Sequence, residues 1–201
     1  MLLPEPNCTG SKKKIGMNEQ PTTLAHEHSP SGRSANSYDA IVALGSNIGD
    51  TRANMAQALT LLCADGVVGI VTRSRDFKTP PWGITDQPWF ANACASVRTA
   101  LDAHALLERC LDVERQMGRV RLQKWGPRII DLDVLVHNQG AIAEADLELP
   151  HPRITERAFV LAPLADVDPD LVLNGKSVRE WLAQTDTTGV VPFADSDVVR
   201  S

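Results

Sequence analysis

The sequence predicts a single α+β domain whose elements follow the order strand, helix, strand, strand, helix, strand. Short apolar or β-branched runs alternate with two stretches whose apolar residues recur at helical spacing, and turn residues separate them. The chain has 201 residues, 43% of them hydrophobic, which is enough apolar material for one core. This order of elements is typical of a ferredoxin-like βαββαβ sandwich.

The expected strands are short runs bounded by glycine, proline or polar turn residues. They are residues 38–44, 67–77, 90–99 and 129–136. Residues 45–50 are expected to form a turn after the first strand. The prolines between residues 79 and 88 exclude a regular element and predict a long loop before the third strand.

Two helices are expected between these strands. Asp50 or Thr51 can cap the first helix, which runs to about Ala64, and Asp102 starts the second, which Gly118 ends. In the second helix the apolar residues recur at positions that share one face. Both helices can therefore bury an apolar stripe against the same sheet.

The ends of the chain differ from its middle. Residues 1–37 lack hydrophobic periodicity and are predicted to be a disordered tail, and residues 186–201 are expected to be loose. The domain itself is predicted to span residues 38–185. After Asn138 it gains an added C-terminal hairpin and short helices. The short helices are predicted near residues 155–164 and 177–184.

Composition argues against several classes of protein. The formal net charge of −5 gives no overall positive field, so we expect no nucleic acid and no membrane as a partner. The four cysteines form no C-x-x-C pair, which indicates reduced thiols. The first residues lack the apolar segment of an export signal, and no stretch reaches the ~20 apolar residues of a membrane span. We therefore expect a cytoplasmic protein.

Two aspartates interrupt the last predicted strand. Side chains alternate along a strand, so Ile130, Leu132, Val134 and Val136 are expected on the core side. Asp131 and Asp133 then share the other side, with Cα atoms roughly 6–7 Å apart. Two carboxylates so close repel unless a cation lies between them, and oxygen ligands suit Mg²⁺. A merely hydrated strand face is the alternative for the Asp-x-Asp pattern alone.

A basic segment precedes the two aspartates. Arg119, Arg121, Lys124 and Arg128 place four cations within ten residues. A solvent-exposed connection is the alternative for this segment by itself. Metal-binding carboxylates next to several arginines are suited to holding a polyphosphate.

Aromatic residues and an amide complete the candidate site. Several of these residues lie in loops or at element ends, where a flat heterocycle could stack: Pro80, Pro81, Trp82, Trp89, Phe90, Trp125 and Phe159. Packing in the core or in a hairpin is the alternative for each aromatic residue by itself. Asn92 offers a donor and an acceptor on one amide. The sequence has neither a Walker A loop nor a strand followed by G-x-G-x-x-G, so it does not support ATP binding by a common nucleotide fold.

The combination resembles the hydroxymethyldihydropterin pyrophosphokinases of folate biosynthesis. Residues 124–135, Lys-Trp-Gly-Pro-Arg-Ile-Ile-Asp-Leu-Asp-Val-Leu, are similar to the signature of that family, and the resemblance covers nearly all of residues 39–184. Further matching motifs are residues 43–47, 79–81, 86–88, 118–121 and 150–151. The resemblance implies transfer of pyrophosphate from ATP to 6-hydroxymethyl-7,8-dihydropterin, with two Mg²⁺ ions, by a protein that we expect to be a monomer.

The resemblance also implies roles for individual residues. The metal ligands are Asp131 and Asp133. The catalytic residues are Arg119, Arg121, Arg128, Asp131 and Asp133. The pterin contacts are Thr79, Pro80, Trp82, Phe90, Asn92, Phe159 and Asp131. The ATP contacts are Glu114, Arg121, Trp125, Arg128, Val134, His151 and Arg157. No residue is apparent as a general base. Phe90 stands where some members have tyrosine, and Leu111 where some have a polar residue.

Two other functions use similar parts. A ferredoxin-like RNA-binding module would use the aromatic residues and the basic segment, although the acidic net charge and the strand aspartates oppose it. A palm-like nucleotidyltransferase or phosphohydrolase would share the paired carboxylates. The identity of the reaction products distinguishes these functions.

Overall fold

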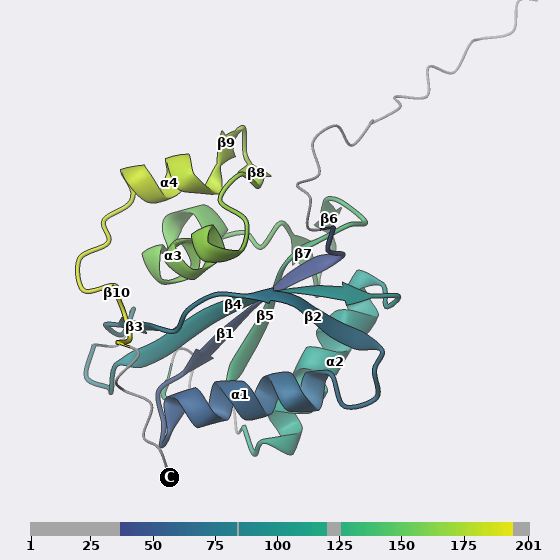
Figure 1. Ribbon diagram of the computed structural model, residues 1–201, viewed down its shortest axis with the longest axis horizontal. Coiled ribbons are helices and arrows are strands. Elements are labelled where there is room, and N and C mark those ends of the chain that lie inside the picture. The colour runs from purple at the N-terminus through teal and green to yellow at the C-terminus, as the bar shows by residue number, and fades with distance from the viewer. Residues whose placement is uncertain (1–36, 84, 120–125, 195–201) are drawn as a thin grey trace, which may run out of the picture. The chain divides into compact units, whose positions relative to one another are not determined.

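The structure is a computed structural model that describes residues 37–83, 85–119 and 126–194. The predicted tail at residues 1–37 lies outside the described residues, apart from Ser37. Six strands form the main sheet, in the order β10-β3-β4-β1-β5, with β2 also paired to β4 (Figure 1). The strands are β1 Ala40–Ser46, β2 Val68–Arg73, β3 Phe77–Thr79, β4 Phe90–Thr99, β5 Asp131–His137 and β10 Val191–Pro192.

Helices cover both faces of this sheet. In Figure 1 the helices α1 and α2 lie below the sheet, and α3 and α4 lie above it. The helices are α1 Thr51–Leu62, α2 Ala103–Gln116, α3 Ala158–Val167 and α4 Val178–Gln184. The antiparallel pairing of β1 with both β4 and β5 gives the βαββαβ arrangement, so the prediction of a ferredoxin-like α+β fold is confirmed.

The first two helices begin where the sequence predicts. The Asp50 carboxylate accepts a hydrogen bond from Ala53 N at 3.0 Å, and the Asp102 carboxylate accepts one from Ala105 N at 2.8 Å. Each bond satisfies a backbone donor that the first helical turn leaves unpaired. Gly118 follows α2 with a φ of +79°, a conformation that glycine adopts without steric cost.

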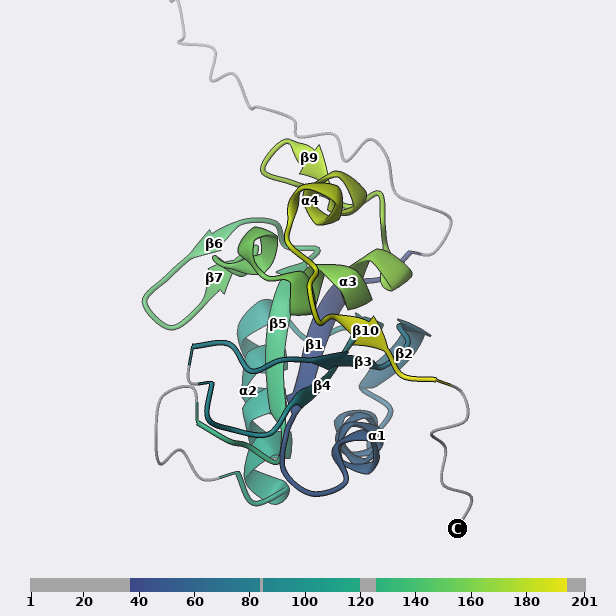
Figure 2. The same cartoon turned by 90° about the vertical axis from the view of Figure 1, so that its left-hand side faces the viewer.

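The added elements follow the sixth core element as expected. A hairpin is formed by β6 Ile142–Ala143 and β7 Glu148–Leu149, and it lies to one side of the sheet next to β5 (Figure 2). The single-turn helix η1 Ile154–Glu156 precedes α3. A second small hairpin, β8 Val172–Leu173 with β9 Lys176–Ser177, precedes α4.

The sheet separates two apolar clusters. Leu132 and Val134 pack with α1 and α2, as expected, but Val136 packs on the opposite side with Leu135. The prediction that Val136 lies on the same side of the sheet as Leu132 and Val134 is therefore wrong. The cause is a register shift: Val42 pairs with Val134 and Ile41 with Val136, so Leu135 is an extra residue in β5.

The predicted strand at residues 67–77 is also divided. It forms β2 and β3, which pair with different parts of β4. Between them Ser74 Oγ accepts a hydrogen bond from Cys94 N at 2.9 Å, and the Asp76 carboxylate accepts one from Arg52 Nε at 2.9 Å. These side-chain bonds hold the connection where the regular ladder is interrupted.

The segment after residue 185 contains a strand that was not expected. Val191 and Pro192 pair with Lys78 and Phe77, and Phe193 N donates to Asp76 O at 2.9 Å. The expectation of a loose segment from residue 186 is therefore wrong at these positions. Two residues are too few for a periodic pattern, so no sequence pattern predicts this edge strand.

Phe193 is expected to stabilise this edge of the sheet. Its ring packs partly buried against the α1 side of the core, 5.4 Å from the Arg52 guanidinium. Phe193→Ala should lower the free energy of unfolding by about 1–3 kcal/mol, less than a fully buried phenylalanine would. Urea unfolding followed by circular dichroism measures this change. Val191→Ala, in the same strand with an exposed side chain, should change stability by less than about 0.5 kcal/mol.

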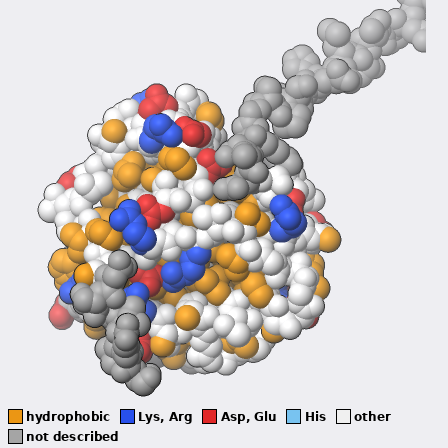
Figure 3. Space-filling view, in the orientation of Figure 1, with side chains coloured by type: hydrophobic (Ala, Val, Ile, Leu, Met, Phe, Trp, Pro, Cys, Tyr) orange, Lys and Arg blue, Asp and Glu red, His pale blue; other side chains and the backbone are white. Residues whose placement is uncertain are grey.

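Two properties of the described residues bear on membranes and on charge. No helix among the described residues is long and apolar enough to cross a membrane. Basic and acidic side chains are interspersed among apolar ones over the described part of the face drawn in Figure 3.

Candidate functional site

A cavity of about 240 Å³ opens on the sheet face that carries α3. Residues from the ends of three central strands form its floor, and loops and α3 form its walls. The lining residues are Ala43, Leu44, Gly45, Thr79, Pro80, Trp82, Phe90, Asn92, Ala93, Arg128, Asp131, Asp133, His151, Arg157, Phe159 and Val160. Most residues that the sequence singled out are thus brought together, from segments more than 80 positions apart.

The two aspartates of β5 both line this cavity. As predicted from strand alternation, they lie on one face, while Leu132 between them is buried in the opposite core. Burial, and then the negative charge of Asp131, raises the pKa of the Asp133 carboxyl above its usual range. Holding two acids this close disfavours their ionised forms, so the pair indicates a site that a cation would stabilise.

Arginines surround Asp131. Its carboxylate accepts a hydrogen bond from Arg119 and forms an ion pair with Arg128 Nη1 at 3.2 Å. Arg119 also donates to the buried carboxylate of Glu114, which accepts a second bond from Leu132 N at 2.8 Å. Glu114 therefore fixes Arg119 against the backbone of β5, and it does not line the cavity.

Arg128 and a further arginine, Arg157, face the cavity with unused hydrogen-bonding capacity. The Nε atoms of Arg128 and Arg157 are buried and have no hydrogen-bond partner among the described residues. Burial, and then the positive charge of Arg153, lowers the pKa of Arg157. Buried donors without an acceptor are destabilising, so both groups favour an anionic ligand with oxygen acceptors.

Aromatic rings lie beneath these guanidinium groups. Arg128 lies 5.2 Å from the centroid of the Phe90 ring, and Arg157 lies 5.5 Å from that of Phe159 and 5.2 Å from that of Trp82. Trp82 is 46% exposed, which is unusual for so large an apolar side chain. The rings offer flat apolar faces at the mouth of the cavity.

A pair of polar side chains also lines the cavity. Asn92 Nδ2 donates to Thr79 Oγ1 at 2.7 Å, and both side chains are buried. This bond uses one of the two amide protons of Asn92 and fixes the plane of its amide group.

Gly45 creates the space between the amide and the acids. It pairs with Asn92 on one side and Asp131 on the other, and a Cβ at this position would lie 2.9 Å from Asn92 Oδ1. Sequence reasoning placed this glycine in a turn and missed its role in the site. A glycine inside a strand, where a side chain would block a neighbour, was the available signal.

A second cavity of about 310 Å³ lies beside the first. Its walls include Val134 and His151, two of the expected nucleotide contacts, as well as Leu107 and the turn of the β6–β7 hairpin. His151 and Asp133 line both cavities. Burial, and then the positive charge of Arg157, lowers the pKa of His151, which favours its neutral form.

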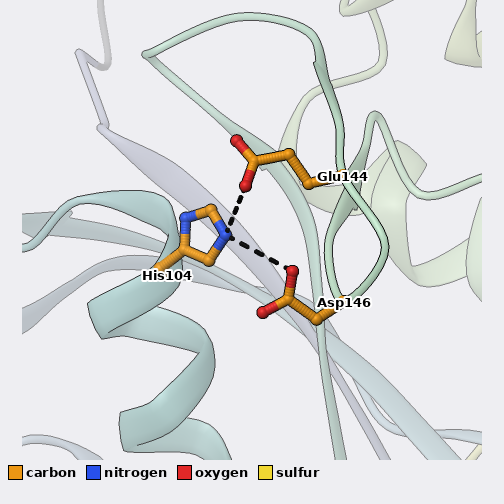
Figure 4. Close-up of side chains that lie close together, drawn as sticks. All are labelled: His104, Glu144 and Asp146. Carbon is orange, nitrogen blue, oxygen red and sulfur yellow. Dashed lines mark ion pairs between the residues drawn. The ribbon is translucent and has the colours of Figure 1, made fainter.

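Three side chains connect the hairpin to α2 at the edge of this second cavity (Figure 4). His104 Nε2 points toward both carboxylates, 3.3 Å from Glu144 Oε2 and 3.8 Å from Asp146 Oδ1. The two carboxylates are largely exposed and His104 is partly exposed. Solvent screening limits such contacts to a few tenths of a kcal/mol up to about 1 kcal/mol, so this cluster contributes modestly to the position of the hairpin.

Two expected site residues, Arg121 and Trp125, lie outside the described residues. The same is true of Lys124 in the predicted basic segment. Their roles stay predictions.

Fold and site together define the class of protein: a ferredoxin-like α+β protein with an arginine-rich, aromatic-lined ligand cavity on one face of its sheet. The chain belongs to the 7,8-dihydro-6-hydroxymethylpterin-pyrophosphokinase (HPPK) family, whose model matches residues 41–169.

Individual relatives agree with this assignment. The chain is 50% identical over 151 residues to a 2-amino-4-hydroxy-6-hydroxymethyldihydropteridine pyrophosphokinase of Methylorubrum extorquens, covering 75% of this chain and 96% of that protein. It is 40% identical over 151 residues to the protein of the same name from Bacillus subtilis, covering 75% and 87% of the two chains.

Solved structures agree in fold. An HPPK-DHPS structure in complex with substrates has a TM-score of 0.60 at 14% identity, and the match covers 74% of this chain and 43% of that one. The Plasmodium falciparum HPPK-DHPS A437G structure with SDX-DHP gives 0.59 at 16% identity, over 74% of this chain and 46% of that chain. This chain thus spans less than half the length of these solved chains.

Proposed function

We infer that this chain is a diphosphotransferase that moves pyrophosphate from ATP to the hydroxymethyl group of 6-hydroxymethyl-7,8-dihydropterin, a reaction of folate biosynthesis. Family membership supports the reaction. The observation in the structure that favours it most is the shared cavity of Asp131 and Asp133 with Arg128 and Arg157, whose Nε donors lack acceptors among the described residues. A triphosphate supplies those acceptors.

The reaction balances without a covalent enzyme intermediate. A bond forms between the pterin hydroxymethyl oxygen and the β-phosphorus of ATP, and the bond from that phosphorus to the α–β bridging oxygen breaks. AMP leaves with the bridging oxygen, and the hydroxymethyl proton is released. Phosphoryl transfer of this kind depends mainly on alignment and on stabilising spread charge, which arginines can supply.

Asp131 and Asp133 are the proposed Mg²⁺ ligands. Both offer carboxylate oxygens on one strand face, and burial, followed by the negative charge of Asp131, raises the pKa of Asp133. Bound Mg²⁺ neutralises phosphate charge and orients the polyphosphate. The number of ions, two, rests on the resemblance. Asp131 is ion-paired with Arg119 and Arg128 in this structure, so metal binding would free these arginines for phosphate.

The aromatic side of the cavity is the proposed pterin site. Phe90 and Phe159 would stack on the pterin, with Pro80 and Trp82 at its edge. Thr79 and Asn92 would supply polar contacts, and the Asn92 amide keeps one proton and its oxygen beyond the bond to Thr79. Asp131 would lie near the reacting hydroxymethyl group.

Gly45→Ala should weaken pterin binding selectively. The new methyl group would displace the Asn92 side chain and break its bond to Thr79. We expect the KM for the pterin to rise about tenfold, or ~1.4 kcal/mol, with the KM for ATP within about twofold. Steady-state kinetics with each substrate varied in turn measures this split. The control Gly69→Ala adds a methyl in β2, where the nearest atom is Arg98 O at 4.0 Å, and should leave both constants unchanged.

The nucleotide is proposed to extend from the arginines into the second cavity. Arg119, Arg128 and Arg157 would hold its phosphates, and Val134 and His151 would contact the rest of it. Arg121 and Trp125 are proposed ATP contacts by resemblance alone. Glu114, which is hydrogen-bonded to Arg119 and Leu132 N, would act through Arg119.

The domain limits, location and assembly are proposals of the same kind. We propose that residues 38–185 form the catalytic domain, completed at its sheet edge by β10. A cytoplasmic location and a monomeric state remain predictions, and light scattering of the purified protein tests the second.

Product analysis tests the proposed reaction. The protein is incubated with ATP, MgCl₂ and 6-hydroxymethyl-7,8-dihydropterin, and the nucleotides are separated by chromatography. AMP and a pterin diphosphate in equal amounts are expected, with neither formed when the pterin or Mg²⁺ is omitted. ADP, free pyrophosphate or inorganic phosphate as the main product would contradict the proposal and support a kinase, a nucleotidyltransferase or a hydrolase.

A further inference from the structure

Asn47 joins three segments that are far apart in the sequence. It follows β1 directly and is 3% exposed. Its Nδ2 donates to Pro88 O at 3.2 Å and to Gln87 Oε1 at 3.1 Å, in the loop that leads into β4. Its Oδ1 accepts from Arg128 N at 2.8 Å, and its own N donates to Arg128 O at 3.1 Å. One buried side chain therefore uses its acceptor and both donor directions on other segments.

The orientation of this amide is fixed by its backbone partners. Arg128 N can only donate and Pro88 O can only accept, so exchanging the oxygen and nitrogen of the amide would break both bonds. An aspartate cannot donate to Pro88, and an apolar residue can satisfy neither partner. The position therefore requires an amide of this length.

The two joined segments lead to different residues of the cavity lining. Pro88 lies two residues before Phe90, which lines the aromatic side, and Arg128 lies three residues before Asp131 on the charged side. Asn47 itself lies two residues after Gly45 of the floor. Its bonds set the distance between the wall proposed for the pterin and the wall proposed for the phosphates.

A simple turn-forming role does not account for these contacts. The turn after β1 is held by Asn54, whose Nδ2 donates to Ile48 O at 2.8 Å and to Ser46 Oγ at 3.2 Å. The side-chain bonds of Asn47 all leave the turn. Asn54 is thus a matched control, because its amide, in the first turn of α1, bonds to the same turn without reaching the other two segments.

We propose that Asn47 is a positioning residue that fixes the segment leading to the pterin contacts relative to the segment leading to the phosphate contacts. The two reactants are thereby aligned for in-line transfer. The proposal rests on the proposed function, since it names pterin and ATP as the occupants of the two walls. Asn47 touches neither reactant in this account. It acts through Pro88 and Arg128.

Two substitutions of Asn47 distinguish the effect of its bond to Pro88 from that of its bond to Arg128. Asn47→Asp keeps the acceptor for Arg128 N but loses the donor to Pro88 O, and Gln87 can compensate only by turning its own amide. We expect the pterin KM and Kd to rise about tenfold, with ATP constants within about twofold. Asn47→Leu loses the bonds to both Arg128 N and Pro88 O. It should therefore also raise the KM for ATP, and its kcat should be at least about tenfold lower than that of Asn47→Asp.

The controls test charge and local bonding. Asn54→Asp adds the same charge next to the same turn, in α1, and should leave the pterin and ATP constants within about twofold of the unaltered protein. Gln87→Met removes one of the acceptors of Asn47 and should raise the pterin KM about two- to threefold. If Asn47→Leu does not fold, the Asn47→Asp and Gln87→Met pair still tests the proposal.

Kinetics and calorimetric binding of the pterin and of a non-hydrolysable ATP analogue are measured on the full chain. Equal changes of pterin and ATP constants in Asn47→Asp, or changes no larger than those of Asn54→Asp, would overturn the positioning role. A lower melting temperature with unchanged constants would do the same. Absence of AMP formation by the unaltered protein would contradict the proposed function instead, and the binding measurements would then decide on Asn47.

Discussion

Asp133→Asn is expected to reduce AMP formation from ATP and the pterin by at least about a thousandfold at saturating Mg²⁺. The substitution keeps the shape of the side chain but removes a proposed metal ligand. The loss should exceed the roughly 10²–10³-fold that removal of one preorganised hydrogen-bond donor costs an enzyme. Initial rates at several Mg²⁺ concentrations measure it, and higher Mg²⁺ should not restore the rate.

The fold of this variant should remain intact. Asp133 lines the cavity, and its replacement removes one of two neighbouring negative charges, so the melting temperature without metal should not fall. Asp170→Asn, at an exposed aspartate ion-paired with Arg179, is the matched control and should keep full activity. A rate for Asp133→Asn within tenfold of the unaltered protein would exclude Asp133 as a metal ligand.

Asn92→Leu should lower kcat/KM for the pterin about a hundredfold, or ~3 kcal/mol. Leucine has a similar volume, but it removes every hydrogen bond that the buried amide could make and leaves the Thr79 hydroxyl without this donor. A site that is built to hydrogen-bond its ligand discriminates strongly when one partner is lost. The KM for ATP should change less than about threefold.

Ser96→Ala is the control for this second variant. Ser96 lies on the same strand as Asn92 and is also buried, but its hydroxyl bonds with Thr72, away from the cavity. Its loss should lower stability slightly without changing the kinetic constants. If Asn92→Leu raised the KM values of both substrates equally, the assignment of Asn92 to the pterin side would be wrong.

Local chemistry made most of the fold predictable. The capping aspartates Asp50 and Asp102 and the terminating Gly118 mark the helices, since each satisfies a need of a helix end. Strand alternation was enough to place Asp131 and Asp133 on one face. These signals are carried by neighbouring residues, so they can be read without knowledge of the tertiary structure.

Features set by distant contacts could not be predicted. The pairing of Val191 and Pro192 with β3 depends on two residues and on an edge that only the folded sheet provides. The role of Gly45 depends on Asn92 in another strand, and that of Glu114 on Leu132 N. In each case the partner lies 18 or more residues away, with no periodic pattern to reveal it.

The extra residue, Leu135, divides β5 into two parts that have different roles. Before it, residues paired with Gly45 through Val42 carry the acids; after it, residues paired with Ile41 and Ala40 close the layer under α3. Deleting Leu135 would restore unbroken alternation and remove one buried side chain from this layer, while Val136 and His137 kept their pairing with Ile41 and Ala40 and both acids kept their orientation. A change at Leu135 would therefore alter the packing beneath α3 without moving the acids. Within this one strand, the residues that stabilise the fold and the residues of the site can vary independently.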